Sequence, residues 1–410
     1  MPDILNFGEG DELIGIVGHL DVVPEGDGWT YPPFSATIDN DAIYGRGAID
    51  DKGPVISSLY AMKYVMENTK NINKRVRLIL GLNEENSWKC IKYYKDHEEI
   101  PSIGFSPDAD FPCIYAEKAI LTNELKTSIL QFDNLDISIK SIDCYNNALN
   151  VVPKICSCVL KINDSKININ EFILNIKSII TKYCFEIDIY KIDNQEIKLT
   201  CYGISSHSAH PELGINAISR LIVVLDELFK CYGYVIDIFD FFGKYINTQY
   251  DGKNLGIDFE DESGKLTLNV GYFGINDNFL KIRMNLRVPV NTDIVKVGNS
   301  FIKYTSSYPN LDFDTTNYMP SLYIDPKSKL VQELCNIFNK ENNSKYPPLA
   351  IGGATYARAF NNFVSFGPNF PGNKDMCHQT DEFISINNLL LSCKIYIKAI
   401  LALINNDLSI

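Results

Sequence analysis

A histidine and an aspartate stand two residues apart near the start of the chain, in the stretch GHLDVVP. They follow the apolar run LIGIV, which predicts a buried strand over residues 13–17. Because side chains alternate along a strand, His19 and Asp21 point to the same side. Taken alone, the pair is best explained as a histidine satisfied by a neighbouring carboxylate. The same pair could also bind a metal ion, so the rest of the chain has to decide.

Three further acidic clusters lie in stretches rich in turn-forming residues. They are GRGAIDDKGP with Asp50 and Asp51, LNEENSW with Glu84 and Glu85, and SPDADFP with Asp108 and Asp110. Each has an ordinary explanation by itself: a helix cap, a solvated turn and an Asx turn. In open α/β sheets, however, ligands bind beyond the carboxyl ends of strands, where His19, Glu84 and Glu85 are predicted to lie.

Carboxylates gathered at one edge of a sheet would repel one another unless a cation sat among them. Carboxylate and imidazole ligands without thiolate suit Zn²⁺, Mn²⁺ or Co²⁺. Of the five histidines, His97 lies in a charged helical run and is predicted to be solvated. The other four lie in loops, where functional groups tend to cluster.

The elements that position these residues alternate along the first third of the chain. Helical spacing predicts a helix over residues 53–69, with Pro54 in its first turn. A strand follows over 75–83, and a helix over 87–99 starts at Ser87. This βαβα order predicts an α/β fold with a mainly parallel sheet and helices on both faces.

The pattern of predicted strands and helices changes between about residues 121 and 320. Period-2 segments such as KLTLNVGYF and LKIRMNLRV alternate with helical stretches such as NAISRLIVVLDELFKCY, which predicts an inserted α+β region. The α/β pattern of strands and helices resumes after residue 322. We therefore predict a discontinuous domain of residues 1–120 and 322–410, interrupted by a second domain of residues 121–321.

Taken together, these stretches resemble a known family. GHLDVVP, GRGAIDDKGP, NEENSW, SPDADFP, SSHSAHPELGINA and GGATYARA…FGPNFPGNKDMCHQTDE look like the successive motifs of the dinuclear zinc M20 metallopeptidases. The PepV-type, carnosinase-like dipeptidases are most similar. The resemblance covers nearly the whole chain in the family's order, and it implies a zinc-peptidase-like catalytic domain with an inserted lid domain.

The resemblance assigns a role to each clustered residue, with two zinc ions per chain and Mn²⁺ or Co²⁺ as substitutes. It implies that His19 binds one ion and His378 the other, that Asp50 bridges both, and that Glu85 and Asp108 complete the ligands. Asp21 would orient the His19 ring. Glu84 would be the general base. A cis peptide between Asp50 and Asp51 is also expected.

Further positions match substrate-binding residues of the family. His207 resembles a lid histidine that reaches the oxyanion, and Arg358 resembles an arginine that binds the substrate's C-terminal carboxylate. Gly352 and Gly353 would let backbone approach the substrate, and Asn150 matches a lid position near it. A loop histidine and a surface ion pair remain open as alternatives for His207 and Arg358. His210 falls outside the aligned positions.

Composition excludes some partners and leaves others open. The net charge of -13 argues against nucleic acid. Eleven cysteines without a CxxC pair predict no disulfide framework and favour a reducing cytoplasm. The stretch LLLSCKIYIKAILALI is too short for a membrane span and predicts an amphipathic helix that starts at Ser385 or Asn387. A small peptide is the expected partner, and a monomer or a homodimer the expected assembly.

The sequence is compatible with three functions. The favoured one is hydrolysis of unblocked dipeptides, with Glu84 taking a proton from a water held between two metal ions. A deacylase or desuccinylase of N-acyl amino acids would use the same residues. An inactive relative is the third, because family members normally carry several dozen residues before the HxD motif and His19 is only eighteen residues from Met1.

Overall fold

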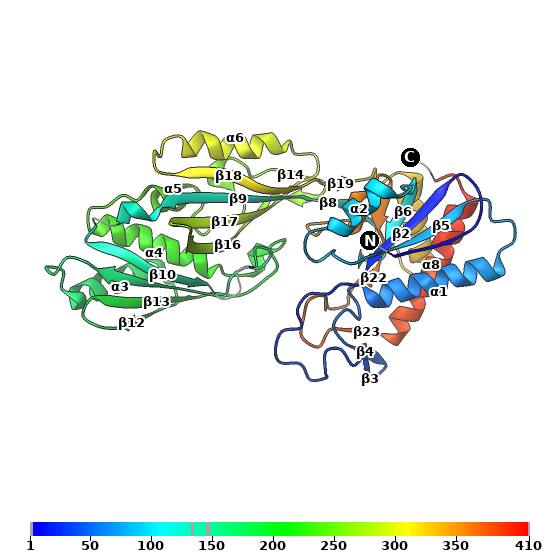
Figure 1. Ribbon diagram of the computed structural model, residues 1–410, viewed down its shortest axis with the longest axis horizontal. Helices are drawn as coiled ribbons and strands as arrows, with labels where there is room; N and C mark the ends of the chain where they lie inside the picture. The colour runs from blue at the N-terminus through cyan, green and yellow to red at the C-terminus, as the bar shows by residue number, and fades with distance from the viewer. Residues whose placement is uncertain (1–2, 133–134, 145–147, 409–410) are drawn as a thin grey trace. The chain divides into compact units, whose positions relative to one another are not determined.

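The computed structural model describes residues 3–132, 135–144 and 148–408. The chain divides into two compact units. Residues 1–117 and 322–410 form what we call the catalytic unit, after the role that the family resemblance implies, and residues 118–321 form the inserted unit. Figure 1 shows the elements of both. Each unit is described by itself.

The catalytic unit is built around an eight-stranded mixed sheet, ordered β1-β5-β2-β6-β21-β8-β19 with β20 paired to β8. Strands β5, β2, β6 and β21 run parallel to one another. Strand β1 pairs antiparallel with β5, β8 with β21, and β19 with β8. The sheet is therefore mixed and not simply parallel. Its strands are β1 (Asp3–Phe7), β2 (Leu13–His19), β5 (Arg75–Gly81), β6 (Ile103–Ser106), β8 (Ile114–Glu117), β19 (Leu322–Tyr323), β20 (Leu349–Ile351) and β21 (Phe363–Ser365).

Helices cover both faces of this sheet. The remaining elements are β3 (Thr37–Asp39), β4 (Ala42–Tyr44), α1 (Lys52–Asn68), α2 (Lys89–His97), β7 (Ala109–Asp110), α7 (Lys329–Glu341), the 3₁₀ turn η4 (Tyr356–Ala359), β22 (Pro368–Asn369), β23 (Phe383–Ser385) and α8 (Ile386–Asn405). On one face, α1 packs on α8 and against β2. The approach to β2 is close, because a Cβ atom added at Gly18 would lie 2.6 Å from the Val55 side chain. On the other face, α2 and η4 pack on Val17 and Ile79.

The structure confirms the predicted start of one helix and contradicts that of another. The Ser385 side chain caps α8 by accepting the Asn388 N–H, as predicted. Ser87, however, does not cap α2. That helix starts after Trp88, which has a left-handed backbone and makes no side-chain cap bond, while the Ser87 hydroxyl donates to the Asn83 side chain instead.

Helix α8 is longer than its apolar stretch predicted. Over the described residues it is the one helix long and apolar enough to cross a membrane by length and composition alone, so the prediction that it is too short was wrong. A core helix of a globular protein passes the same test. Tyr396 and Ile400 of α8 are fully buried in the catalytic unit.

The inserted unit contains two four-stranded antiparallel sheets, ordered β10-β11-β13-β12 and β16-β17-β9-β18. Helix α4 contacts strands of both sheets, and its nearly continuous apolar sequence explains why it is buried almost all round. The elements are β9 (Ala119–Ser128), η1 (Ile129–Phe132), β10 (Ile137–Cys144), β11 (Ile155–Ile162), α3 (Ile169–Tyr183), β12 (Ile187–Lys191), β13 (Glu196–Tyr202), η2 (Pro211–Leu213), α4 (Ala217–Cys231), α5 (Asp237–Tyr245), η3 (Lys253–Leu255), β14 (Glu260–Asp261), β15 (Gly264–Lys265), β16 (Thr267–Asn276), β17 (Phe279–Val288), α6 (Ile294–Thr305) and β18 (Asp312–Met319).

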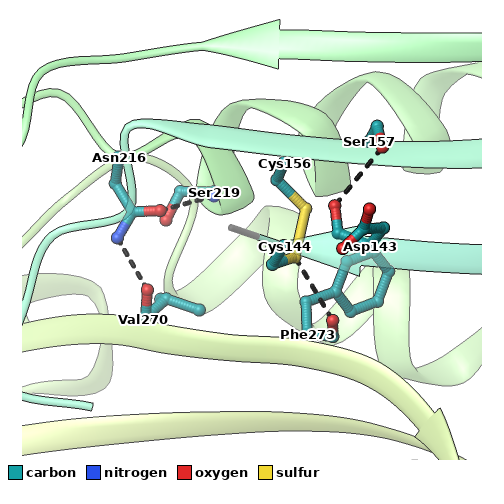
Figure 2. The surroundings of a disulfide bond; sticks show 8 residues. All are labelled: Asp143, Cys144, Cys156, Ser157, Asn216, Ser219, Val270 and Phe273. Atoms are coloured by element: carbon teal, nitrogen blue, oxygen red, sulfur yellow. Dashed lines mark hydrogen bonds between the residues drawn. A yellow bond between two sulfur atoms is a disulfide. The ribbon is translucent and has the colours of Figure 1, made fainter. Parts of the chain in front are cut away.

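One disulfide joins β10 to β11, between Cys144 and Cys156 (Figure 2). The antiparallel register places these two residues directly opposite each other. The remaining nine cysteines are free. The absence of a disulfide framework was predicted, but this single pair was not, because it depends on strand register and not on a spacing motif.

Candidate metal centre

Three parallel strands end at the same edge of the catalytic sheet. His19, the last residue of β2, pairs with Gly81, the last residue of β5, and β6 ends nearby at Ser106. The residues that follow these strands include Asp21, Glu84, Glu85 and Asp108, which therefore gather at this edge. Side-chain contacts show how closely they approach one another.

Asp50 lies between two imidazole rings. Its Oδ1 is 2.9 Å from Nε2 of His19, and its Oδ2 is 3.0 Å from Nε2 of His378. Glu85 Oε1 also lies 3.0 Å from Nε2 of His378, and Asp108 Oδ2 lies 3.7 Å from Nε2 of His19. The five residues predicted to bind metal thus form one cluster with Asp50 at its centre.

Asp21 fixes both His19 and the Glu84–Glu85 turn. Its main-chain carbonyl lies 2.9 Å from Nδ1 of His19, whereas its carboxylate lies 3.5 Å from that atom. A carbonyl can only accept, so Nδ1 carries a proton and Nε2 is the atom turned toward Asp50. The Asp21 carboxylate accepts the N–H groups of Glu84 and Glu85 at 3.0 and 3.1 Å. The orientation of His19 therefore comes mainly from the Asp21 backbone.

Burial and neighbouring charges shift the pKa values of several groups in the cluster. Burial raises the pKa of Glu84 to about 8, and the nearby charges of Glu85 and Asp50 add to that rise. Burial also raises the pKa of Asp108 well above its usual range. For His378, hydrogen bonds to Asp50 and Glu85 overcome the effect of burial and raise the pKa to about 10. The cluster thus retains protons, which a bound cation would displace.

The Asp50–Asp51 peptide is cis, as predicted. Asp51 occupies the N-cap position of α1, but its side chain makes no cap hydrogen bond. The fully buried carboxylate instead accepts the His19 N–H at 3.1 Å. Helix capping therefore does not explain this aspartate pair.

Glu382 holds the loop that carries Asp50, and sequence reasoning did not assign it a role. Its fully buried carboxylate accepts the N–H groups of Gly47, Ile49 and Asp50 at 2.9 to 3.2 Å. It also pairs with Arg46 at 2.8 Å. The available signal was its place in CHQTDE, four residues after His378, where only the histidine was given a function.

Arg358 lies in a buried ion pair within the catalytic unit. Its Nε lies 2.9 Å from Glu117 Oε2, and both side chains are at most 1% exposed. Its Nη2 donates to the Gly353 carbonyl at 2.8 Å. Gly352 and Gly353 lie in the loop before η4, and both are partly buried. The ion pair considered for Arg358 at the surface is therefore a buried one.

His207 and Asn150 belong to the inserted unit. A backbone bridge joins Val151 to His207, and the Asn150 carbonyl accepts the Ser208 N–H at 2.8 Å. The Ala209 N–H donates to Nδ1 of His207 at 3.3 Å, so a neutral ring carries its proton on Nε2. His210 lies 3.1 Å from Glu212. The structure therefore brings His207 and Asn150 together on neighbouring segments.

Comparisons with known proteins show which family the chain belongs to. The model of peptidase family M20/M25/M40 matches residues 15–402. A protein of Bacillus subtilis named "Putative dipeptidase YtjP" is 36% identical over 411 residues, which cover 97% of this chain and 84% of that protein. The chain belongs to peptidase family M20/M25/M40. This M20 chain is also 31% identical over 412 residues to a protein of Staphylococcus haemolyticus with the same kind of name, with coverage of 97% and 84%.

Solved structures agree on the fold of this M20 peptidase. The metallo-carboxypeptidase Sso-CP2 of Sulfolobus solfataricus superposes with a TM-score of 0.55 at 17% identity, covering 97% of this chain and 86% of that one. Human carnosine dipeptidase 1 gives a TM-score of 0.53 at 14% identity, covering 98% and 83%. At these identities the superpositions establish the M20 fold, and the family match establishes a peptidase.

Proposed function

We propose that this M20 peptidase is a dinuclear metal-dependent dipeptidase of the PepV type, which hydrolyses unblocked dipeptides. The observation that carries the proposal is the position of Asp50, whose two oxygens each approach a different imidazole. Relatives named as dipeptidases over nearly the whole chain support the substrate class.

The donor set fits two divalent ions. His19 and Asp108 would hold one ion, His378 and Glu85 the other, and Asp50 would bridge them. Ligand atoms of His19, Asp50 and Glu85 already lie within 4.8 Å of one another, and so do those of His19, Asp51 and Asp108. Imidazole nitrogen and carboxylate oxygen favour Zn²⁺, with Mn²⁺ or Co²⁺ as substitutes. When bound, such ions would polarise the scissile carbonyl and lower the pKa of the attacking water.

Glu84 performs the proton transfers in this proposal. Its carboxylate takes a proton from the attacking water and delivers it to the amine that leaves. Burial raises the pKa of this carboxyl in the metal-free chain, and a glutamate whose pKa is moved toward neutrality can both accept and release a proton at neutral pH. Asp21 holds the Glu84 main chain through its N–H, which keeps this carboxylate beside the cluster. The neighbouring Glu85 is held instead by His378.

Substrate contacts outside the cluster are assigned by the family resemblance. His207 with a proton on Nε2 would donate to the developing oxyanion. Arg358, beside the glycine pair Gly352 and Gly353, would bind the substrate's carboxylate while it keeps Glu117 as a partner. Asn150 would contact the substrate from the segment that pairs with His207. The inserted unit would serve as the lid that carries both residues.

Metal analysis followed by turnover assays tests the proposal. The purified chain should contain up to two metal ions and hydrolyse unblocked dipeptides in the presence of Zn²⁺ or Mn²⁺. Glu84→Gln should lower kcat by about 10²–10⁴-fold with metal content unchanged, because only the proton carrier is lost. Glu98→Gln, which changes a half-buried glutamate at the end of α2 outside the cluster, is the matched control.

Three outcomes would contradict the proposal. Hydrolysis of N-acetyl or N-succinyl amino acids in preference to dipeptides would favour the deacylase function. Stoichiometric metal without turnover of either class would identify an inactive relative. Activity that does not respond to Glu84→Gln would remove the proton-transfer role from this residue.

A further inference from the structure

The inserted unit contains a pocket of about 210 Å³ beside the start of α4. Its lining includes the apolar residues Val152, Ile215, Leu268 and Val270, and the buried polar residues Ser219 and Asn269. Its outer side is polar and includes the exposed residues 248–250. None of these residues belongs to the metal cluster or matches a substrate position. The pocket thus has an apolar wall, a few buried polar groups and a polar opening.

Arg220 is the only charged residue among those that line the pocket. Its guanidinium carbon lies 5.0 Å from the centroid of the Phe185 ring, which also lines the pocket. This cation–π contact uses none of the N–H donors of the guanidinium. Within the described part of the chain, the Arg220 side chain makes no hydrogen bond or ion pair. Its donors are therefore available to a ligand that enters the pocket.

We propose that this pocket binds a small organic carboxylate with an apolar tail, of about the size of a free amino acid. The Arg220 fork would bind the carboxylate through two N–H donors, the arrangement that guanidinium groups prefer. The apolar wall would take the tail. A volume of about 210 Å³ exceeds that of an apolar cavity of roughly 150 Å³ that holds benzene, so a ligand with a short branched tail fits.

Two asparagines connect this pocket to the segment that carries Asn150. Asn216 lines the pocket, accepts the Ser219 N–H and donates to the Val270 carbonyl, as Figure 2 shows. It also donates to Asn269, whose amide holds the carbonyls of Leu149 and Val151 at 3.1 and 2.9 Å. A ligand against this wall should therefore also steady residues 149–151.

Methyl NMR of the full chain distinguishes this pocket from the metal cluster. We would titrate 4-methylpentanoate and follow the methyl groups of Val152, Ile215 and Leu268, with leucine as a second arm. Both ligands should shift these signals in a saturable way, with a Kd on the order of 1 mM. A larger effect of leucine would identify a free amino acid as the source of the carboxylate, and an equal effect would identify the carboxylate and tail as sufficient.

Variants and a neutral ligand make the test decisive. Arg220→Gln should weaken binding by about tenfold or more, because a charge-assisted hydrogen bond is lost. Lys161→Gln changes the net charge equally at an exposed position of β11 and should leave the Kd unchanged. The proposal fails if the pocket methyls do not shift, if 4-methylpentanamide binds as tightly as the carboxylate, or if Arg220→Gln binds like wild type.

Hydrogen exchange tests the connection to residues 149–151. Saturation with 4-methylpentanoate should slow exchange of the Ser208 and Val152 amides, which pair with Asn150 and Ser206. Unchanged exchange at saturation would refute the connection through Asn269.

Discussion

Replacing Glu382 by glutamine removes a charge from the inside of the catalytic unit without changing its shape. Oε1 of Glu382 accepts the N–H groups of Ile49 and Asp50, and Oε2 accepts the N–H of Gly47 and a donor of Arg46. If the NH₂ group of the glutamine replaced either carboxylate oxygen, it would face the two N–H donors that this oxygen accepts, and both hydrogen bonds would be lost. Arg46, which is only 4% exposed, would lose its counter-charge.

The expected loss follows from burial. Breaking one side of a buried ion pair costs about 3–5 kcal/mol, a large part of the roughly 5–15 kcal/mol that stabilises a domain. With a urea slope of about 2 kcal/mol/M, the unfolding midpoint should fall by about 2 M. Metal affinity should fall by about 10–100-fold, because the same carboxylate fixes the loop that carries Asp50.

Urea unfolding followed by tryptophan fluorescence reports on the catalytic unit specifically. Both tryptophans of the chain, Trp29 and Trp88, lie in it, and Trp29 stacks on Arg46. Glu67→Gln is the matched control, because Glu67 makes an exposed pair with Lys63 that should be worth under about 1 kcal/mol. A Glu382→Gln midpoint as close to wild type as that of the control would refute the reasoning.

Three further predictions concern the cluster and the disulfide. His378→Ala should lower the metal content from two ions to one per chain by elemental analysis, and retention of two ions would refute its role as a ligand. Folding raises the pKa of Glu84 from 4.5 to about 8 and that of His378 from 6.5 to about 10, so both protonated groups stabilise the metal-free folded chain at low pH. Each contribution to the free energy of unfolding is lost as the pH rises between these two values. The difference in Tm between metal-loaded and metal-free chain should therefore widen from about pH 6 to about pH 9, and a constant difference would contradict this. Alkylation of the unfolded chain without reductant should label nine of the eleven cysteines, and labelling of all eleven would exclude the bond between Cys144 and Cys156.

Local patterns predicted the elements that carry the site. The helix predicted over residues 53–69 spans 52–68, and the strand predicted over 75–83 spans 75–81. Because His19 ends a strand and Glu84 follows the next strand of a parallel sheet, their gathering at one edge also followed from sequence. The cis peptide at Asp50–Asp51 came from the family resemblance and is confirmed.

Features that depend on distant pairing were not predicted. Strand β21 lies between β6 and β8, although about 250 residues separate it from either in sequence, and no local pattern contains that placement. The pairing of Arg358 with Glu117 has the same cause, since the two residues are 241 positions apart. The supporting role of Glu382 was missed because a lone glutamate in a loop does not show which N–H groups it will accept.

The placement of β21 has a consequence for the order of synthesis. Strand β21 covers one edge of β6, and His378 and Glu382 follow β21 in the chain. While residues 118–365 are being made, at about 5–20 residues per second, that edge of β6 stays unpaired for roughly 12–50 s and the carboxylates lack their second histidine. The nascent chain therefore presents an open strand edge for this interval, and protection by a chaperone or by early folding of the inserted unit would matter most then.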